Sequence, residues 1–394
     1  MTTLSAASHA PANEDEVRAL VTDAAARSVP LAISGGATKA GVGRPAQTQE
    51  TVSTTGLSGI TLYEPAELVI GARAGTPLAE VEATLAEKNQ RLAFEPADWR
   101  ALLGTSGEPT IGAVAAANVS GPRRIMVGAA RDALIGVRFV NGRGEAVKNG
   151  GRVMKNVTGL DLVKTIAGSW GTLGVLTEVT FKVLPMPERT ATLVYPGLDD
   201  ARAVSALSAA LGSPYEVTGA AHLPGDGGTL IRIEGFEASV RYRLGELRTL
   251  LSEYGEPALV ENADGEALWR GVRDVGPLVQ PADRAVWKIS TAPTRAPALT
   301  ASIAMRIEAR WLYDWGGGLV WLATEPSEAA ARVVREATRA HRGHATLIRA
   351  PADLRAAIDV FEPLPEAMMR LTKGLKASFD PKGIFEPGRM YAGV

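Results

Sequence analysis

The pattern of hydrophobic and polar positions divides the chain into two parts, which meet near residue 190. The first part opens with a helical pattern over residues 14–28. Short apolar runs predict strands at residues 30–33, 59–63, 68–72, 133–141, 146–148 and 175–184. Between these strands, the pattern predicts a helix over residues 77–88, with Thr76 as its N-cap and Pro77 at its first position.

The predicted elements of the second part, which follows Pro185 and Pro187, occur twice in the same order. Strand, helix, strand, strand and helix are predicted over residues 192–253 and again over residues 285–341. This repetition predicts one α+β domain built from two similar halves. An amphipathic helix is predicted over residues 363–379, with an apolar stripe of Leu364, Met368, Leu371, Leu375 and Phe379.

The composition excludes several classes of protein. Lysine plus arginine (42) and aspartate plus glutamate (43) nearly cancel, so no overall charge attracts nucleic acid or an anionic membrane. The absence of cysteine excludes disulfides, iron–sulfur ligation and a cysteinyl cofactor link within this chain. No basic, apolar leader begins the chain, and no apolar run reaches the length of a membrane span. These features predict a cytoplasmic protein, which would meet the inner face of the membrane only through partner subunits.

Three stretches rich in small residues are the main chemical signal. The stretch "SGGATKAG" at residues 34–41 follows a predicted strand, but its spacing matches neither the P-loop nor the Rossmann fingerprint. Its glycines predict positive φ angles and backbone N–H groups that converge on an anion such as a diphosphate. The other stretches are "GEPTIGAVAAANVSGPRR" at 107–124 and "AGSWGTLGVLTEVTFKVLP" at 167–185. Each alone is typical of a tight turn, but together they predict one large ligand.

These three stretches resemble the FAD-binding domain of the vanillyl-alcohol oxidase superfamily, and most closely the FAD-binding subunits of bacterial glycolate oxidase (glycolate dehydrogenase). Nearly the whole chain is covered, because "GAARDALIG", "VMKNVTGLDL", "ALWRGVRD" and "FDPKGIFEPGRM" also fit. The resemblance implies an α+β fold with a two-part FAD-binding domain of the PCMH type at residues 1–188. An α+β cap domain would follow at 189–362, and a C-terminal segment at 363–394 would return to the FAD-binding domain.

The resemblance also implies which residues bind FAD. The pyrophosphate loop would consist of Ser34, Gly35, Gly36, Ala37, Thr38, Lys39 and Gly41. The second loop would line the pyrophosphate, ribityl chain and flavin through Thr110, Gly112, Ala113, Asn118, Ser120 and Gly121. The adenine end would meet Gly171, Gly174 and Val175, and the tail would return around Pro387 and Gly388. Ala113 replaces a common glycine of the family, and Glu386 replaces an asparagine.

The predictions of how FAD is attached and which residues are catalytic depend on fewer residues. Covalently linked relatives use histidine or cysteine near these loops; this chain has no cysteine, and no histidine between His9 and His222, which predicts noncovalent FAD. Arg273 of "ALWRGVRD" matches the family's arginine that faces the flavin and binds a substrate carboxylate; the alternative is an ion pair with Asp274 or Glu266. The segment "HLPGDGG" at 222–228 only partly resembles the family's metal-linked histidine motif, so we interpret it as a hairpin turn and predict no metal site.

Three hypotheses for function follow. In the first, the chain is a glycolate oxidase subunit that passes electrons between a catalytic FAD subunit and an iron–sulfur subunit as glycolate is oxidised to glyoxylate. In the second, it is a self-sufficient FAD-dependent dehydrogenase for a small 2-hydroxy acid such as D-lactate. In the third, the nucleotide site is structural and the chain is an assembly scaffold. The missing histidine–metal motif favours the first over the second, and the complete FAD loops favour it over the third.

Overall fold

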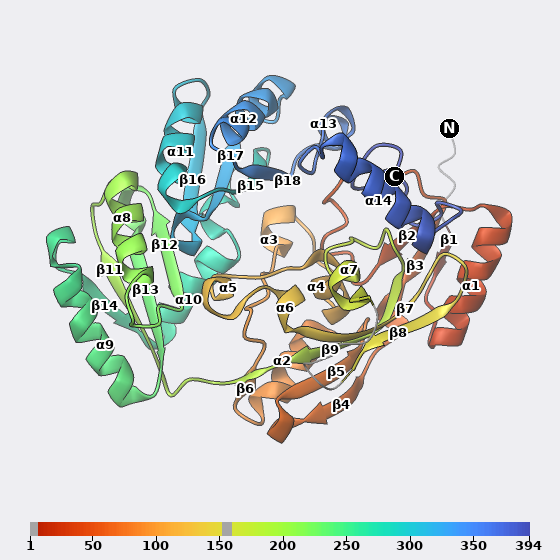
Figure 1. Ribbon diagram of the computed structural model, residues 1–394, viewed down its shortest axis with the longest axis horizontal. Helices are drawn as coiled ribbons and strands as arrows, with labels where there is room; N and C mark the ends of the chain where they lie inside the picture. The colour runs from red at the N-terminus through yellow and green to blue at the C-terminus, as the bar shows by residue number, and fades with distance from the viewer. Residues whose placement is uncertain (1–6, 152–159) are drawn as a thin grey trace.

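The structure, a computed structural model, describes residues 7–151 and 160–394 and confirms an α+β fold (Figure 1). The segment "VMKNVTGLDL" falls largely outside the described residues. Near the N-terminus lies a three-stranded parallel sheet of β1 (Ala7–His9), β3 (Glu50–Ser53) and β2 (Leu31–Ser34). A five-stranded antiparallel sheet follows, in the order β4 (Ile60–Glu64), β5 (Val69–Arg73), β9 (Val175–Lys182), β7 (Leu134–Val140) and β8 (Ala146–Gly150).

The predicted strands of this part are confirmed within a residue or two at most ends, whereas β1 and β3 were not predicted. The N-cap assignment at Thr76 is wrong. Helix α2 (Leu78–Ala86) has Pro77 at its N-cap, because the Thr76 hydroxyl donates to Arg73 O (2.7 Å). The same hydroxyl accepts from Gly59 N (3.0 Å), so it joins the two ends of the β4–β5 hairpin instead of capping the helix.

The cap domain contains an eight-stranded sheet with internal symmetry. One half comprises β11 (Arg189–Tyr195), β12 (Gly219–Leu223), β13 (Gly228–Gly235) and β14 (Ala258–Glu261). Its counterpart comprises β15 (Ala285–Ser290), β16 (Ala309–Asp314), β17 (Leu319–Thr324) and β18 (His344–Arg349). The order β14-β11-β13-β12-β16-β17-β15-β18 is the same from either edge when corresponding strands are exchanged. The prediction of two similar halves is therefore confirmed.

Four helices cover one face of this sheet, whereas α10 (Asn262–Arg273) and the FAD-binding part of the chain cover the other. The helices are α8 (Asp200–Leu211), α9 (Glu237–Leu250), α11 (Ala296–Ala304) and α12 (Glu328–Ala340) (Figure 1). Side chains alternate between faces along a strand. Accordingly, Trp287 and Tyr313 pack against the helices, whereas Leu312 and Trp321 pack with Trp99 and the FAD-binding part. Trp287 and Trp321 thus belong to the hydrophobic cores on opposite faces of the sheet.

Buried ion pairs also join the two domains. Glu95, whose side chain is 10% exposed and which has a left-handed φ of 57°, accepts two hydrogen bonds from Arg232 of β13, at 3.0 Å each. Arg123 binds Glu95 (3.1 Å) and Glu234 of β13 (2.8 Å). Burial alone would raise the pKa of Glu95, but Arg232 and Arg123 hold it below its usual value. The paired charges fix the cap sheet against the loop that precedes α3 (Arg100–Leu103).

The C-terminal helix α14 (Glu366–Phe379) differs from the prediction in the face that it buries. The predicted apolar stripe lies largely in solvent, since the exposed fractions are 49% for Met368, 67% for Leu371 and 39% for Leu375. Of the stripe, Phe379 at the end of the helix does pack, stacking on Phe139 with ring centroids 5.9 Å apart, and Lys376 is buried beside it.

The tail after α14 runs beside β2 of the FAD-binding part. Leu31 N donates to Ile384 O (2.7 Å), and Glu386 N donates to Leu31 O (3.0 Å). The buried Lys376 ammonium donates to Asp380 Oδ2, Thr172 O and Phe385 O, at 2.7 Å each. These contacts seat the tail on the FAD-binding part. In the described part of the chain, no helix is long and apolar enough to cross a membrane.

Replacing Lys376 by methionine should destabilise the protein by about 3–5 kcal/mol, since Asp380 would stay buried without its counter-charge. Urea unfolding measures the effect, and Lys373→Met, on the exposed side of α14, is the matched control. The control should change the free energy of unfolding by less than about 0.5 kcal/mol. Equal stability of the two variants would show that the ion pair does not hold the tail.

Candidate functional site

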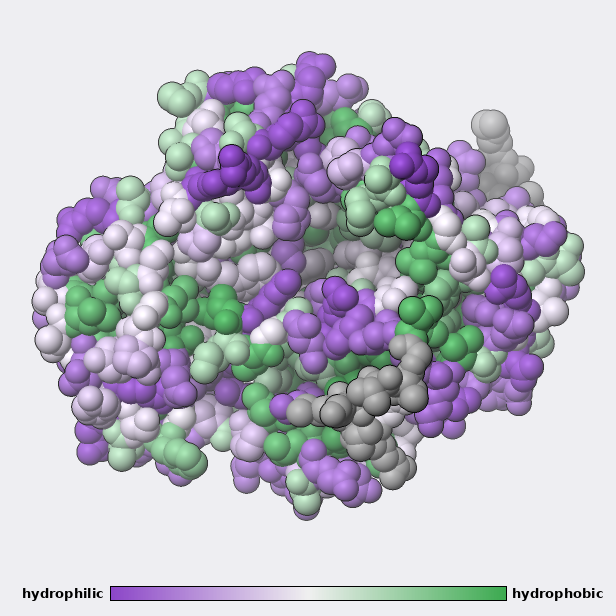
Figure 2. All heavy atoms as spheres, viewed as in Figure 1, coloured by the Kyte–Doolittle hydropathy of each residue, from purple (hydrophilic) through white to green (hydrophobic). Residues whose placement is uncertain are grey.

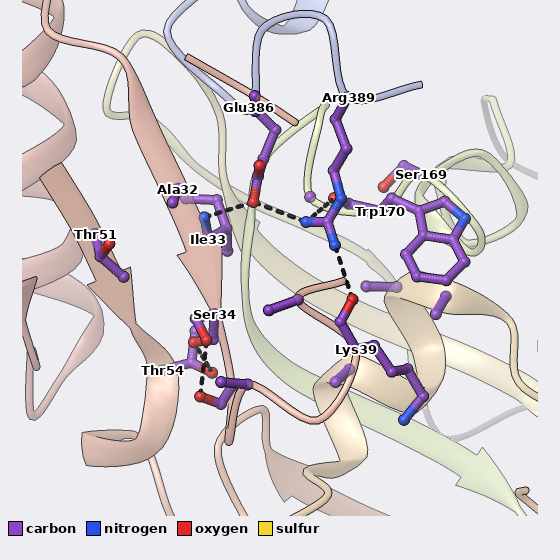
Figure 3. Close-up of a pocket in the computed structure, with 18 of the residues that line it drawn as sticks. Ala32, Ile33, Ser34, Lys39, Thr51, Thr54, Ser169, Trp170, Glu386 and Arg389 are labelled. Carbon is purple, nitrogen blue, oxygen red and sulfur yellow. Dashed lines mark hydrogen bonds and ion pairs between the residues drawn. The ribbon is translucent and has the colours of Figure 1, made fainter. Parts of the chain in front are cut away.

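A cavity of about 460 Å³ lies where the three small-residue stretches and the tail meet. Its walls come from β2 and the loop after it, from α4 (Ile111–Ala117), from residues 169–176 and from the tail. Figure 3 shows residues from these segments facing one space, with Lys39, Trp170 and Arg389 on one side and Ser34 and Thr54 on another. Segments distant in sequence therefore form one site.

The glycines of the first loop are needed for close approach, not for positive φ as predicted. Neither Gly35, Gly36 nor Gly41 has a left-handed φ; in this loop that conformation belongs to Ala37 (58°). A Cβ added to Gly36 would lie 1.8 Å from Glu108 O. One added to Gly107 would lie 1.7 Å from Gly36 O. The backbones of the two loops thus touch directly, which no larger residue allows.

The second loop is held equally closely. A Cβ on Gly112 would lie 2.6 Å from Ala74, and one on Gly35 would lie 2.2 Å from the Thr110 hydroxyl oxygen. That hydroxyl is buried and has no hydrogen-bond partner among the described residues. Buried polar groups are nearly always satisfied in complete structures. An unsatisfied hydroxyl beside two glycine backbones fits a polar ligand.

The charges around the cavity suit an anionic ligand. Four cationic side chains and one carboxylate, Glu386, occur among its described lining residues. Arg389 donates to Glu386 (2.8 Å), while Arg44 and Arg355 donate to backbone carbonyls. Among the described residues, the buried Lys39 ammonium has only a 3.5 Å contact with Thr38, and burial lowers its pKa to about 8. A buried cation without a bonded carboxylate is available to a diphosphate, so the residues present fit FAD.

The predicted FAD-binding residues divide into two groups. Those lining the cavity are Ser34, Gly35, Ala37, Thr38, Lys39, Gly112, Ala113, Gly171 and Gly174. Those outside its lining are Gly36, Gly41, Thr110, Asn118, Ser120, Gly121 and Val175. Gly36 and Thr110 lie directly behind the wall, whereas Val175 belongs to a hydrophobic core. Asn118 and Ser120 accept from the backbone N–H groups of Arg131 and Ala130, so they orient the following segment.

Several lining residues were not predicted. Arg355 comes from α13 (Ala352–Ala357) and carried no sequence signal, since its approach depends on how the tail folds back. Trp170 and Arg389 stand within recognised motifs but were not selected; the Arg389 guanidinium carbon lies 5.5 Å from the Trp170 ring centroid. Glu386, the family departure, has a left-handed φ of 45°, which asparagine tolerates better than most residues. Its carboxylate accepts from Ile33 N (2.9 Å), so the tail keeps its contact with β2.

Arg273, at the end of α10 (Asn262–Arg273), lies outside the cavity lining. Its guanidinium donates to both carboxylate oxygens of Asp274, at 2.8 and 2.7 Å. Asp274 also accepts from Asp98 N (2.8 Å), which joins the pair to the loop before α3. The ion pair with Asp274, one of the two alternatives for Arg273, is therefore present in the structure.

His222 has a structural environment at the centre of the cap sheet, where it pairs with Tyr313 across the two halves. The hairpin turn predicted after it is confirmed by the pairing of β12 with β13. Its ring nitrogens lie 2.9 Å from Thr229 Oγ1 and 3.3 Å from Asp200 Oδ1. Tyr313 and Trp311 also donate to Asp200 Oδ2, at 2.6 and 2.9 Å. The histidine thus belongs to a buried polar network that joins the two halves.

Comparisons with known proteins agree with this fold. A family model described as an FAD-binding domain matches residues 6–150. The 4-ethylphenol oxidase from Gulosibacter chungangensis superposes with a TM-score of 0.68, covering 98% of this chain and 89% of that one at 12% identity. An alkyldihydroxyacetonephosphate synthase gives 0.68 over 96% and 76%, at 17% identity. The fold and the matched domain define an FAD-binding protein.

Sequence similarity narrows the class further. The glycolate oxidase subunit GlcE of Escherichia coli (strain K12) is 36% identical over 373 residues, which cover 94% of this chain and 95% of that protein. The chain belongs to the GlcE family of glycolate oxidase subunits.

Replacing Gly36 by alanine should abolish FAD binding, because the added methyl group would overlap Glu108 O and separate the two loops. Gly41→Ala is the matched control, since its Cβ would meet nothing within 4 Å and its φ is not left-handed. The flavin-to-protein absorbance ratio of each purified variant measures occupancy. Full occupancy in Gly36→Ala would contradict the assigned role of this contact.

Proposed function

We propose that this chain is the FAD-binding subunit of a glycolate oxidase complex and that it relays electrons within the complex instead of oxidising glycolate by itself. The observation that carries the proposal is the end-to-end similarity to GlcE in a chain whose loops form a glycine-lined, cationic cavity. The partners would be a catalytic FAD subunit and an iron–sulfur subunit, since this cysteine-free chain cannot ligate such a cluster. The complex would be cytoplasmic and would meet the membrane through its other subunits.

Oxidation of glycolate to glyoxylate requires a base for the hydroxyl proton, a clamp for the carboxylate and an acceptor for the hydride. Bound FAD supplies the acceptor. Among the described residues that line the cavity there is no histidine, and the single carboxylate, Glu386, already accepts from Ile33 N and Arg389. Burial raises the pKa of Glu386, but the two hydrogen bonds that its carboxylate accepts give it a structural role.

Arg273, the predicted clamp for the substrate carboxylate, is already paired with Asp274. The two N–H groups of Arg273 that face Asp274 both donate to its carboxylate. A substrate carboxylate would have to displace Asp274, which also accepts a hydrogen bond from Asp98 N. A general base typically contributes about 10²- to 10⁴-fold to a rate. No free base occurs among the described residues that line the cavity. These residues therefore favour a role in which the chain accepts electrons from an already reduced partner.

FAD should be bound noncovalently, because neither histidine, cysteine nor tyrosine occurs among the described lining residues. Mild acid or heat should therefore release all of the flavin from the purified chain. The absorbance of the supernatant and of the precipitated protein measures the two fractions. Flavin that stays with the denatured chain would disprove this attachment.

The isolated, FAD-loaded chain should oxidise glycolate and D-lactate at least about 10²-fold more slowly than the complete complex, because it lacks a free base. The test is dye reduction by the chain alone, by the catalytic and iron–sulfur subunits without it, and by all three together. The proposal expects high activity only in the last mixture. The three-subunit mixture is also assayed with a Gly36→Ala chain. A Gly41→Ala chain, which should retain its flavin, is the matched control.

Two results would contradict this assignment. Rapid glycolate oxidation by the isolated chain would support a self-sufficient dehydrogenase. Full activity of the complex with an FAD-free Gly36→Ala chain would support a scaffold, provided that the variant still assembles with its partners in gel filtration.

A further inference from the structure

A polar groove of about 410 Å³ lies between helix α12 of the cap domain and residues 357–363, at the end of α13 and beyond. Three carboxylates and four arginines line it, the arginines being Arg44, Arg332, Arg335 and Arg339. In Figure 2, strongly hydrophilic residues (purple) gather on the surface over α12. None of the three glycine-rich stretches reaches α12, so the groove needs an explanation of its own.

Two of the arginines fix the floor of the groove. Arg335 is half-buried and donates to Glu362 (2.7 Å) and to the backbone carbonyls of residues 359–361. Arg44, from the loop after β2, donates to two backbone carbonyls at the end of α13, at 2.8 Å each. Arg44 also lines the FAD cavity, so the groove and the FAD cavity share a wall. These bonds join α12, the tail segment and the first FAD loop.

The other two arginines have exposed side chains on the rim. Within residues 7–151 and 160–394, Arg332 and Arg339 form neither a side-chain hydrogen bond nor an ion pair. They are seven residues apart, which is about two turns of α12, so both point to the groove about 10 Å apart along the helix axis.

The three carboxylates of the groove do not neutralise these two arginines. Glu336 binds Arg306 (2.8 Å), which lies outside the groove lining. Glu328 lies in the first turn of α12, where the helix dipole stabilises a negative charge. Asp359 is one of the acids that oppose the lowering of the pKa of Arg335 by burial. The available positive charge of the groove is therefore that of its two rim arginines.

The internal repeat of the cap domain offers a comparison for α12. Helix α9 holds in the first half the position that α12 holds in the second. On α9, Arg241 donates to Glu237 (2.7 Å), and the buried Arg243 donates to Glu216 (3.1 Å). Arg248, near the end of α9, is exposed but lies outside the groove lining. The arginines of the groove thus belong to the half that meets the tail and the first FAD loop.

We propose that this groove binds an acidic segment of another subunit of the glycolate oxidase complex. The inference rests on the proposed function, because it names a contact surface within that complex. Two carboxylates about 10 Å apart, a span of about three residues in an extended chain, would meet Arg332 and Arg339. A guanidinium binds a carboxylate through two parallel hydrogen bonds. Because Arg44 borders both cavities, a subunit docked here would lie beside the FAD cavity, which suits electron transfer between subunits.

The test measures how fast the purified, FAD-containing chain associates with the catalytic and iron–sulfur subunits, by biolayer interferometry at low and at high salt. A chain with both Arg332→Glu and Arg339→Glu should associate about tenfold or more slowly at low salt and lose most of its salt dependence, since complementary charges steer the encounter. Lysine at both positions keeps the charges and should retain most of the rate. Arg248→Glu, on the corresponding helix α9, is the matched control and should change the rate by less than about twofold. Flavin content and thermal unfolding verify that each variant is folded.

Several outcomes would overturn the proposal. Equal rates for the unaltered chain and the double variant would remove the groove from the interface and leave the proposed function intact. Equal slowing by Arg248→Glu would show that overall charge, not the groove, governs association. Pyrophosphate binding that is lost in Arg332→Glu, with subunit association unchanged, would identify a small-anion site instead. Failure of the unaltered chain to join either subunit would contradict the proposed function and this inference with it.

Discussion

The direct contact between two backbone segments at Gly36 and Gly107 is the constraint on which the FAD site depends. At both positions a Cβ atom would lie less than 2 Å from the carbonyl of the opposite loop. This contact places the first loop after β2 against the segment that leads into α4. The cavity forms beside it and is lined by Lys39, whereas Thr110 lies behind its wall; among the described residues, the Thr110 hydroxyl has no hydrogen-bond partner and the Lys39 ammonium has no carboxylate partner. Backbone rather than side chains thus sets the distance between the two walls.

The tail completes the cavity by a different kind of interaction. Lys376 and Asp380 form a buried ion pair that also binds the carbonyls of Thr172 and Phe385. It positions Glu386 to accept from Ile33 N and to bind Arg389, which in turn donates to the carbonyls of Trp170 and Lys39. One chain of polar contacts therefore runs from the C-terminal helix to the first loop. Because its members are buried, loss of one would expose the rest to uncompensated charge.

The boundary between the domains combines satisfied and unsatisfied charges. Glu95, Arg232, Arg123 and Glu234 neutralise one another and hold the cap sheet in place. Arg124 and Lys288 lie against the Trp315 ring and form no ion pair with any described residue. The first group holds the two domains together through charge pairs that cross their boundary.

The sequence by itself determined the local elements, the repeated halves of the cap domain, the three glycine-rich stretches and the exclusion of any cysteine chemistry. These follow from residues adjacent in the chain, since strand, helix and turn preferences depend on short-range geometry. Only the tertiary structure decided that Gly36 is indispensable while Gly41 is open, that Arg273 is bound to Asp274, and that the apolar stripe of α14 faces solvent. It also brought Arg355 and Arg389 to the cavity. Each of these depends on close approach or charge pairing between chain segments that a local pattern does not encode.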